Sequence, residues 1–235
     1  MFETKLLQAF ARMNIPCDEQ KAAQMHRYFS LLLQANAQMN LTNVTDEDDA
    51  ILLHFCDSAS LLPLFSFPEQ SRCLDVGTGA GFPGMVLAIL CPDVEFTLMD
   101  SLQKRVGFLQ QVVSTLGLAN VQCVHARAEQ AAHELAYREK YQFVVARAVA
   151  NLRVLSEYCL PFVKTGGQMI AFKGPQAEQE CIEAKAALQK LGGKLLQIKD
   201  AQVPGRAHRL IFVEKTRSTP KAYPRKAGTP SRQPL

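Results

Sequence analysis

The sequence has no segment that would take the chain into or across a membrane. No apolar run approaches the roughly 20 residues that a membrane-spanning helix needs, and the run over residues 85–91 is much shorter. The N-terminus carries Glu3 and Gln8, where a signal peptide would have a basic start and an unbroken apolar core. We therefore expect a cytoplasmic protein without a membrane partner.

Patterns for metal binding and for disulfides are also missing. The seven cysteines are odd in number, scattered and never spaced as CxxC, so neither a zinc knuckle nor a disulfide framework is indicated. We expect reduced thiols that pack as small core residues, and no metal. Glycine and proline, at 13 and 12 residues, are too few for a fibrous or disordered chain. The 48% hydrophobic and 20% charged side chains are typical of a globular protein.

Acidic residues are absent from the C-terminal end of the chain. Residues 215–235 hold no Asp or Glu and six basic side chains, which are Lys215, Arg217, Lys221, Arg225, Lys226 and Arg232. Residues 1–214 hold 20 basic against 22 acidic side chains, a net charge of −2, whereas the whole chain carries +4. A nearly neutral body with a basic end predicts a polyanionic partner.

The pattern of apolar residues divides the chain into three parts. Residues 1–68 are predicted to form a helical arm. Apolar side chains recur at three- and four-residue steps over residues 18–39, where Asp18 is a start signal for a helix. Thr45, followed by Asp48, resembles a capping box that opens a second helix, which runs to Pro63. Within residues 69–215, five strand–helix repeats are followed by two strands. This order predicts an α/β fold with a doubly wound, mostly parallel, seven-stranded sheet. Residues 216–235 form a basic, proline-rich tail without periodicity.

A turn at residues 203–205, Val-Pro-Gly, separates the last two strands and favours an antiparallel pairing between them. The most informative segment lies earlier, where LDVGTGAGFPG over residues 74–84 follows a buried strand and opens a helix. From Gly79 it matches GxGxxG, which is typical of dinucleotide sites. From Asp75 it reads DxGxGxG, with Gly77, Gly79 and Gly81, which suits S-adenosylmethionine (AdoMet), the acid lying by the methionine amine.

Further positions belong to the same predicted site; Asp100 does not discriminate between the cofactors, whereas Ala128, Glu129 and Arg147 favour AdoMet. Asp100 ends the next strand, within reach of ribose hydroxyls in either case. Ala128 and Glu129 follow the third strand, where an adenine ring would lie, and Arg147 follows the fourth strand and faces the crevice where a substrate meets the cofactor. No second catalytic domain is left for a hydride acceptor, which favours AdoMet. An NAD(P)-dependent oxidoreductase and a non-catalytic AdoMet- or RNA-binding module stay as alternatives.

Motifs that carry a family resemblance run through almost the whole chain. They are MNLTNV (39–44), HFCDS (54–58), LDVGTGAGFPG (74–84), LMDSLQKRVGFL (98–109), HARAE (125–129), VVARAVANL (144–152), FKG (172–174) and YPRKAGTPSRQPL (223–235). Together they resemble the bacterial 16S rRNA guanine-N7 methyltransferase family, also called glucose-inhibited division protein B. The resemblance implies a Rossmann-like AdoMet-dependent fold behind a helical arm, and methyl transfer to N7 of one guanine in the 16S rRNA of the small ribosomal subunit.

The resemblance also implies the residues that contact AdoMet, with Asp100 at the ribose and the other contacts at Gly77, Phe82, Ala128, Glu129 and Arg147. This family usually has leucine at the position of Phe82, so Phe82 is the one departure of the chain from the family pattern. Guanine N7 carries an unprotonated lone pair and is exposed in the major groove. Because the sulfonium methyl is already activated, transfer needs alignment but no general base, and the absence of an acid–base dyad is expected.

Residues predicted to act on the RNA come from the arm and from the ends of strands. Arg147 and Lys173 are expected at the reacting base, and the further RNA contacts are expected at Asn40, His54, Asp57, Arg209 and Arg225. His54 and Asp57 lie three residues apart, so a purely structural hydrogen bond between them is the alternative.

The basic tail has two interpretations. Its composition predicts a disordered extension, whereas the family resemblance suggests that Tyr223, Pro224 and Arg225 dock on the body of the protein or on the RNA. We expect the protein to be a monomer.

Overall fold

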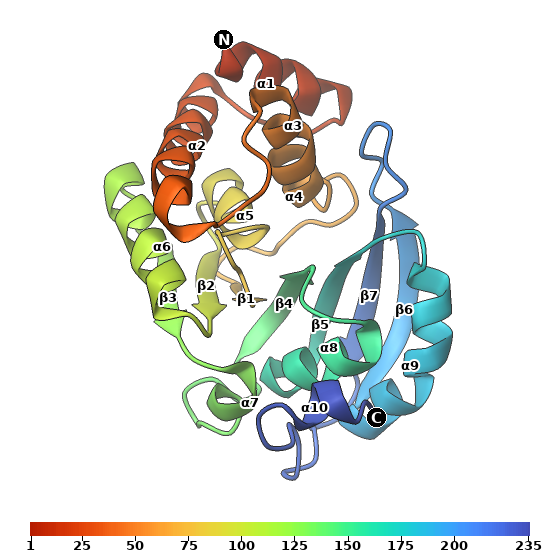
Figure 1. The fold of residues 1–235 in the computed structure, drawn as a ribbon. Helices are drawn as coiled ribbons and strands as arrows, with labels where there is room; N and C mark the ends of the chain where they lie inside the picture. Colours follow the sequence, from red (N-terminus) through yellow and green to blue (C-terminus); the bar gives the residue numbers. More distant parts are fainter.

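A computed structural model describes all of residues 1–235 and contains one seven-stranded sheet (Figure 1). Its strands are β1 (Arg72–Val76), β2 (Glu95–Asp100), β3 (Val121–His125), β4 (Tyr141–Arg147), β5 (Val163–Lys173), β6 (Gly193–Asp200) and β7 (Arg209–Lys215). They lie in the order β3-β2-β1-β4-β5-β7-β6. Only β7 runs antiparallel to its neighbours, β5 and β6. The predicted doubly wound, mostly parallel sheet is confirmed, as is the antiparallel pairing of the last two strands.

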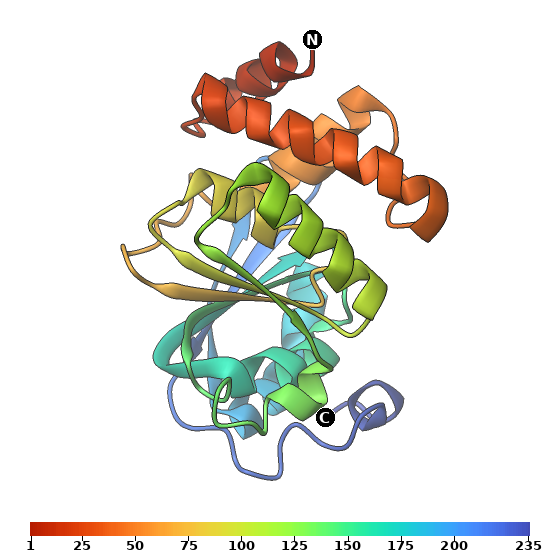
Figure 2. The ribbon, with the colours of Figure 1, turned by 90° about the vertical axis from the view of Figure 1, so that its left-hand side faces the viewer.

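Helices cover both faces of this sheet (Figure 2). One face carries α5 (Gly84–Leu90) and α6 (Gln103–Leu116), with the helical arm outside them. The other face carries α8 (Leu152–Cys159) and α9 (Ala177–Leu191). A short helix, α7 (Ala128–Ala131), follows β3, and η2 (Leu160–Phe162) precedes β5. Each face has its own buried apolar core because the strands alternate their side chains between the two faces.

The arm comprises α1 (Phe2–Arg12), α2 (Glu19–Met39), α3 (Glu47–Ala50), the π-helical segment η1 (Ile51–Cys56) and α4 (Asp57–Ala59). Helix α2 begins where the Asp18 carboxylate accepts a hydrogen bond from the Lys21 amide at 2.8 Å. The next helix is capped by Asp46 and not, as expected, by Thr45, because the Asp46 carboxylate accepts from the amides of the first turn. The helical segment that begins there continues through η1 and α4 and ends at Ala59, before the predicted end at Pro63. Apolar residues of the arm belong to the same core as the sheet face beneath it.

The C-terminal residues 216–235 lie against the body and end in α10 (Thr229–Arg232), near α8. The main-chain carbonyl of Pro224 bonds to His133, and that of Tyr223 accepts from Arg138. These contacts favour the second interpretation of the segment, in which it docks on the body of the protein. Lys215, counted with the basic end of the chain, is instead fully buried and pairs with Glu139 at 3.2 Å. No helix in the structure has the length and apolar character that crossing a membrane requires.

Candidate functional site

A cavity of about 350 Å³ opens at the carboxyl ends of β1, β2 and β3. The strand order reverses between β1 and β4, and ligands of doubly wound sheets bind in the crevice at such a point. Four of the predicted cofactor residues line the cavity, namely Gly77, Asp100, Ala128 and Glu129. We call it the cofactor cavity.

Asp75 shapes the loop that borders this cavity but does not line it. The residue is fully buried, and its Oδ2 accepts hydrogen bonds from the Thr78 hydroxyl at 2.7 Å and the Gly84 amide at 2.8 Å. Burial raises the pKa of Asp75 to about 6, against the opposing effect of these two hydrogen bonds. Its Oδ1 is buried without a partner. The carboxylate therefore ties the two ends of the glycine-rich loop together.

The three glycines of the predicted AdoMet motif differ in what surrounds them. Gly77 lines the cavity with φ of +69°, and a Cβ there would lie 2.9 Å from Cγ2 of Val149. The Gly79 amide donates to Oδ2 of Asp100 at 2.9 Å. Gly81 faces the arm, because a Cβ there would lie 2.5 Å from the Tyr28 hydroxyl. Of the three, only Gly77 lines the cavity, and the space beside Gly79 is open, with no atom within 4 Å of a Cβ placed there.

The two acidic residues of the cofactor cavity are held by main-chain amides. Asp100 is 3% exposed and accepts from the Gly79 amide with one oxygen and from the Leu102 amide, at 2.9 Å, with the other. Oε1 of Glu129, in the first turn of α7, accepts from the Gly228 amide at 3.0 Å. Both carboxylates are thus oriented before any ligand is bound.

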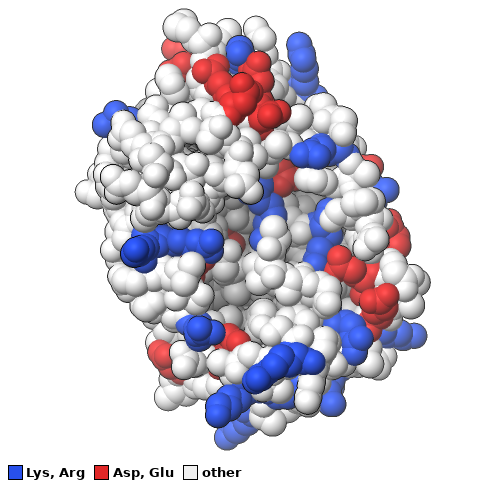
Figure 3. Space-filling view, viewed as in Figure 1, with Lys and Arg blue, Asp and Glu red and all other residues white.

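A second cavity, of about 380 Å³, adjoins the first at Ala148, which lines both. It brings together five residues that the sequence predicted for substrate contact, His54, Asp57, Arg147, Lys173 and Arg209. Figure 3 shows Lys and Arg side chains gathered around the hollow on this face of the molecule. We call this space the basic cavity. A larger groove between α9 and the edge strand β6 is lined by none of the predicted residues.

Asp57 joins three parts of the chain inside the basic cavity. Its Oδ2 accepts from Nη1 of Arg147, at the end of β4, at 2.7 Å, and its Oδ1 lies 2.5 Å from Nδ1 of His208, in the loop before β7. Nη1 of Arg147 also donates to the carbonyl of Leu53, in η1. Burial would raise the pKa of Asp57, but hydrogen bonds from His208 and Arg147 and their charges hold it below its usual value.

His54 does not bond to Asp57. Its Nε2 lies 2.8 Å from the Thr42 hydroxyl, and its ring stacks on that of Phe82 with centroids 4.4 Å apart. Burial and the positive charge of Arg147 lower the pKa of His54 from 6.5 to about 4. The imidazole is therefore neutral at pH 7, and its Nδ1 is buried without a partner.

Comparison with known proteins agrees with this arrangement. The family model GidB, described as rRNA small subunit methyltransferase G, matches residues 21–210. The chain belongs to this family. Ribosomal RNA small subunit methyltransferase G of Leuconostoc citreum is 49% identical, over 94% of each chain. The protein with the same description from Lactobacillus delbrueckii subsp. bulgaricus is 45% identical, over 97% of each chain.

Solved structures show the same fold at lower identity. A SAM-dependent methyltransferase from Aquifex aeolicus superposes with a TM-score of 0.52 and 20% identity, over 70% of this chain and 92% of that one. TYW2 of M. jannaschii, solved in complex with AdoMet, has a TM-score of 0.52 and 17% identity, over 64% and 72%. The sheet of this family member is therefore a Rossmann-like methyltransferase sheet.

Phe82, the departure from the family pattern, lies in an aromatic cluster and lines neither cavity. Its ring packs against Tyr28 and Phe55 of the arm as well as against His54. The Arg147 guanidinium lies over the Phe82 ring, 5.3 Å from its centroid. The larger side chain is accommodated between the arm and the sheet, so its packing does not require a ligand.

Like Arg147, the other two cations of the basic cavity, Lys173 and Arg209, are paired with acids. Nζ of Lys173 is 2.7 Å from Oε2 of Glu180 and donates to the carbonyl of Ala150. Arg209 pairs with Asp200 at 2.8 Å and with Glu178 at 3.3 Å. An incoming phosphate would therefore compete with carboxylates for these side chains.

Asn40 and Arg225 lie outside both cavities. Asn40 ends α2 in the left-handed conformation, with φ of +48°, and is exposed. The Arg225 guanidinium is bonded to the carboxylate of Glu157, which is 1% exposed, with Nη2 at 2.7 Å from Oε2. Arg225 therefore ties the C-terminal residues to the body, and its contact with RNA stays a prediction.

Sequence reasoning missed His208 in the basic cavity, and Tyr158 and Val149 in the cofactor cavity. His208 had a detectable signal. Because β7 is antiparallel, its first residues lie at the edge where the parallel strands end, so a histidine just before β7 falls into the same crevice. Tyr158 had none, because it comes from α8 and enters the cavity only through the packing of that helix.

Proposed function

We propose that the protein transfers a methyl group from AdoMet to N7 of one guanine in 16S rRNA. The observation that carries this proposal is that two different cavities meet at Ala148. The first is lined by Gly77 and by two carboxylates and two guanidinium groups, those of Asp100, Glu129, Arg105 and Arg127. The second is lined by three cations and one carboxylate, those of Arg147, Lys173, Arg209 and Asp57. Membership in the rRNA small subunit methyltransferase G family favours this activity over the NAD(P)-dependent oxidoreductase that the GxGxxG match allowed.

The chemical groups that line the cofactor cavity are of the types that would bind AdoMet. Carboxylates of Asp100 and Glu129 are suited to hydroxyl and amino groups of a nucleoside, and the backbone of Gly77 lines the same cavity. When bound, AdoMet supplies a methyl group on a positively charged sulfur, which needs no further activation. Asp75 and Phe82 support the loop from behind, so their contribution to binding is through its shape.

The chain's own residues bind and orient the guanine, and no proton transfer is required of them. The N7 lone pair is free at neutral pH. The neutral imidazole of His54 and the ionised Asp57, whose pKa values are both lowered, are unsuited to delivering protons at pH 7. Arg147 is held between Asp57 and the Leu53 carbonyl, so its position is set before substrate arrives. Alignment alone contributes on the order of 7–11 kcal/mol in favourable cases.

The direct test uses methyl-labelled AdoMet and small-subunit particles that lack the modification. The labelled guanine is located by chain cleavage specific for N7-methylated guanine. One labelled guanine supports the reaction, the substrate and the atom together. Label at another atom would refute N7, and AdoMet binding without any label would favour the non-catalytic binding module.

A pair of lysine variants tests the basic cavity in the same assay. Lys173→Ala should lower kcat/KM by about tenfold or more, because a charged hydrogen bond contributes about 1.5–3 kcal/mol. Lys185→Ala, on the exposed face of α9, is the matched control and should leave kcat/KM unchanged. Equal rates for the two variants would remove Lys173 from the substrate site.

A further inference from the structure

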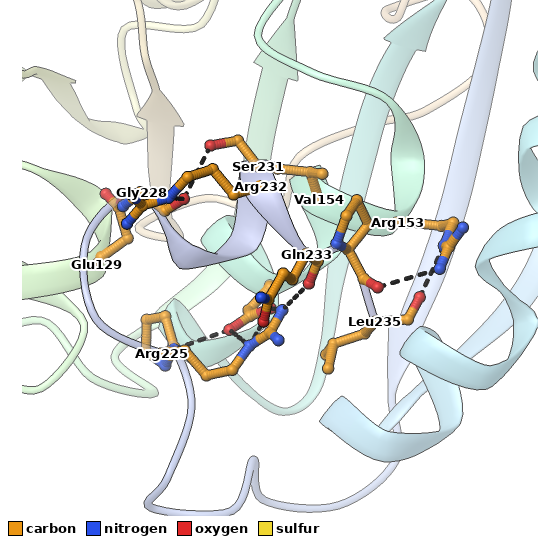
Figure 4. Close-up of polar contacts among 12 residues, drawn as sticks. Glu129, Arg153, Val154, Arg225, Gly228, Ser231, Arg232, Gln233 and Leu235 are labelled. Carbon is orange, nitrogen blue, oxygen red and sulfur yellow. Dashed lines mark hydrogen bonds and ion pairs between the residues drawn. The ribbon is translucent and has the colours of Figure 1, made fainter.

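Residues 216–235, here called the C-terminal strap, dock on the body through several contacts, and those of Arg225 and Gly228 are drawn in Figure 4. Arg225 makes a two-pronged ion pair with the buried Glu157, with Nε–Oε1 and Nη2–Oε2 distances of 2.9 and 2.7 Å. Arg138 donates to the main-chain carbonyls of Thr219 and Tyr223 at 2.8 and 2.9 Å. A paired, hydrogen-bonded guanidinium facing a buried carboxylate is a strong and directional contact.

Beyond Arg225, the strap reaches a side chain of the cofactor cavity. The Gly228 amide donates to Oε1 of Glu129, while Oε2 of Glu129 bonds to no other group of the chain. Gly228 has φ of +80°, a conformation that favours glycine and that turns the chain into α10. Helix α10 then packs on α8, the helix that contributes Tyr158 to the same cavity.

We propose that the C-terminal strap positions Glu129 for the cofactor. This inference rests on the proposed function, because it takes AdoMet as the ligand of the cofactor cavity. Glu129 is half-buried on a helix of only four residues, so its side chain has rotamer freedom that binding would have to remove. The strap amide holds one carboxylate oxygen and leaves the other without a partner in the chain. AdoMet binding and strap docking therefore strengthen each other by the same factor.

Two truncations separate this role from the stability of the strap itself. A chain ending at Lys226 keeps the Arg225–Glu157 pair but loses the Gly228 amide and α10. A chain ending at Arg232 keeps the Arg225–Glu157 pair, the Gly228 amide and α10. It loses only the last three residues, with the contacts of Gln233 and Leu235. Calorimetric titration with AdoMet, without RNA, should show about tenfold weaker binding for the first chain, equivalent to about 1.4 kcal/mol. The second chain should bind within about threefold of the full chain.

A Glu129→Gln background identifies the route of the effect. If the strap acts through Glu129, truncation at Lys226 costs little further affinity once the carboxylate is gone, whereas independent effects would add. Hydrogen exchange of the full chain, which needs no variant, should show slower exchange over residues 226–232 when AdoMet is added. Unchanged affinity of the chain ending at Lys226, additive effects in the Glu129→Gln background, or unchanged exchange would each overturn the proposal. Absence of AdoMet binding by the full chain would instead overturn the proposed function, and this inference with it.

Discussion

Replacing Asp57 by asparagine tests whether one buried carboxylate holds the arm, β4 and the loop before β7 together. Asp57 is 4% exposed and bonds to Arg147 at 2.7 Å and to His208 at 2.5 Å. Removing one partner of a buried ion pair costs about 3–5 kcal/mol, because the other charge is left uncompensated. Arg147 keeps the Leu53 carbonyl as an acceptor and its side chain is 16% exposed, so we expect the lower end, about 3 kcal/mol.

The matched control is Asp200→Asn. Asp200 pairs with Arg209 at a similar distance, 2.8 Å, but its side chain is 57% exposed. Because solvent screens an exposed pair, the control should leave the free energy of unfolding close to that of the wild-type chain. Urea unfolding at pH 7 followed by circular dichroism measures both variants, since the chain has no tryptophan for fluorescence. Equal losses in the two variants would refute the argument that burial decides the contribution.

The ionised state of Asp57 also predicts that the effect of Asp57→Asn on stability depends on pH. The pKa of Asp57 is lowered from 3.8 in the folded chain, so the stability that its ionisation provides is present above about pH 4 and lost as pH falls through the folded value. The difference in unfolding free energy between the wild-type chain and Asp57→Asn should therefore shrink in strong acid. A difference that stays constant down to pH 2 would contradict an ionised Asp57.

Three other predictions concern His54 and the strap. Because the pKa of His54 is lowered from 6.5 to about 4, stability should fall by up to about 3 kcal/mol as pH drops through this window, and His54→Gln should flatten the fall in urea titrations at successive pH values. Arg225→Ala leaves Glu157 buried without its partner and should lower the free energy of unfolding by about 3 kcal/mol. The control Arg232→Ala removes an exposed side chain and should change the free energy of unfolding by less than about 0.5 kcal/mol. Equal melting temperatures of the two variants would contradict this expectation. The strap has four exposed basic residues, Arg217, Lys221, Lys226 and Arg232. If they contact RNA, the slope of log affinity against log salt concentration should be about −3. A slope near zero would exclude the contact.

The elements that local sequence patterns specify were largely predictable. The Asp18 cap of α2, the helix after the glycine-rich loop and the alternation of strands and helices depend on residues within about one helical turn or one strand of each other. The glycine-rich loop was recognisable for the same reason, because the residues that Asp75 ties together lie at most nine positions away. The error at Asp46, where Thr45 was expected, is a shift of one residue between two acceptable caps.

Local patterns were enough to tell which segments become strands and helices. They also placed the glycine-rich loop, Asp100 at the end of β2 and Glu129 after β3 at one edge of the sheet. Which side chains from distant parts of the chain join them there depends on the three-dimensional packing. Asp57 and His208 are 151 residues apart, and Arg225 is 68 residues from Glu157. No local pattern encodes such a pairing, because it depends on the order and direction of the strands and on where the C-terminal strap crosses α8. The composition of the strap indicated its charge, but the buried carboxylate of Glu157 decides that Arg225 is an anchor of the fold.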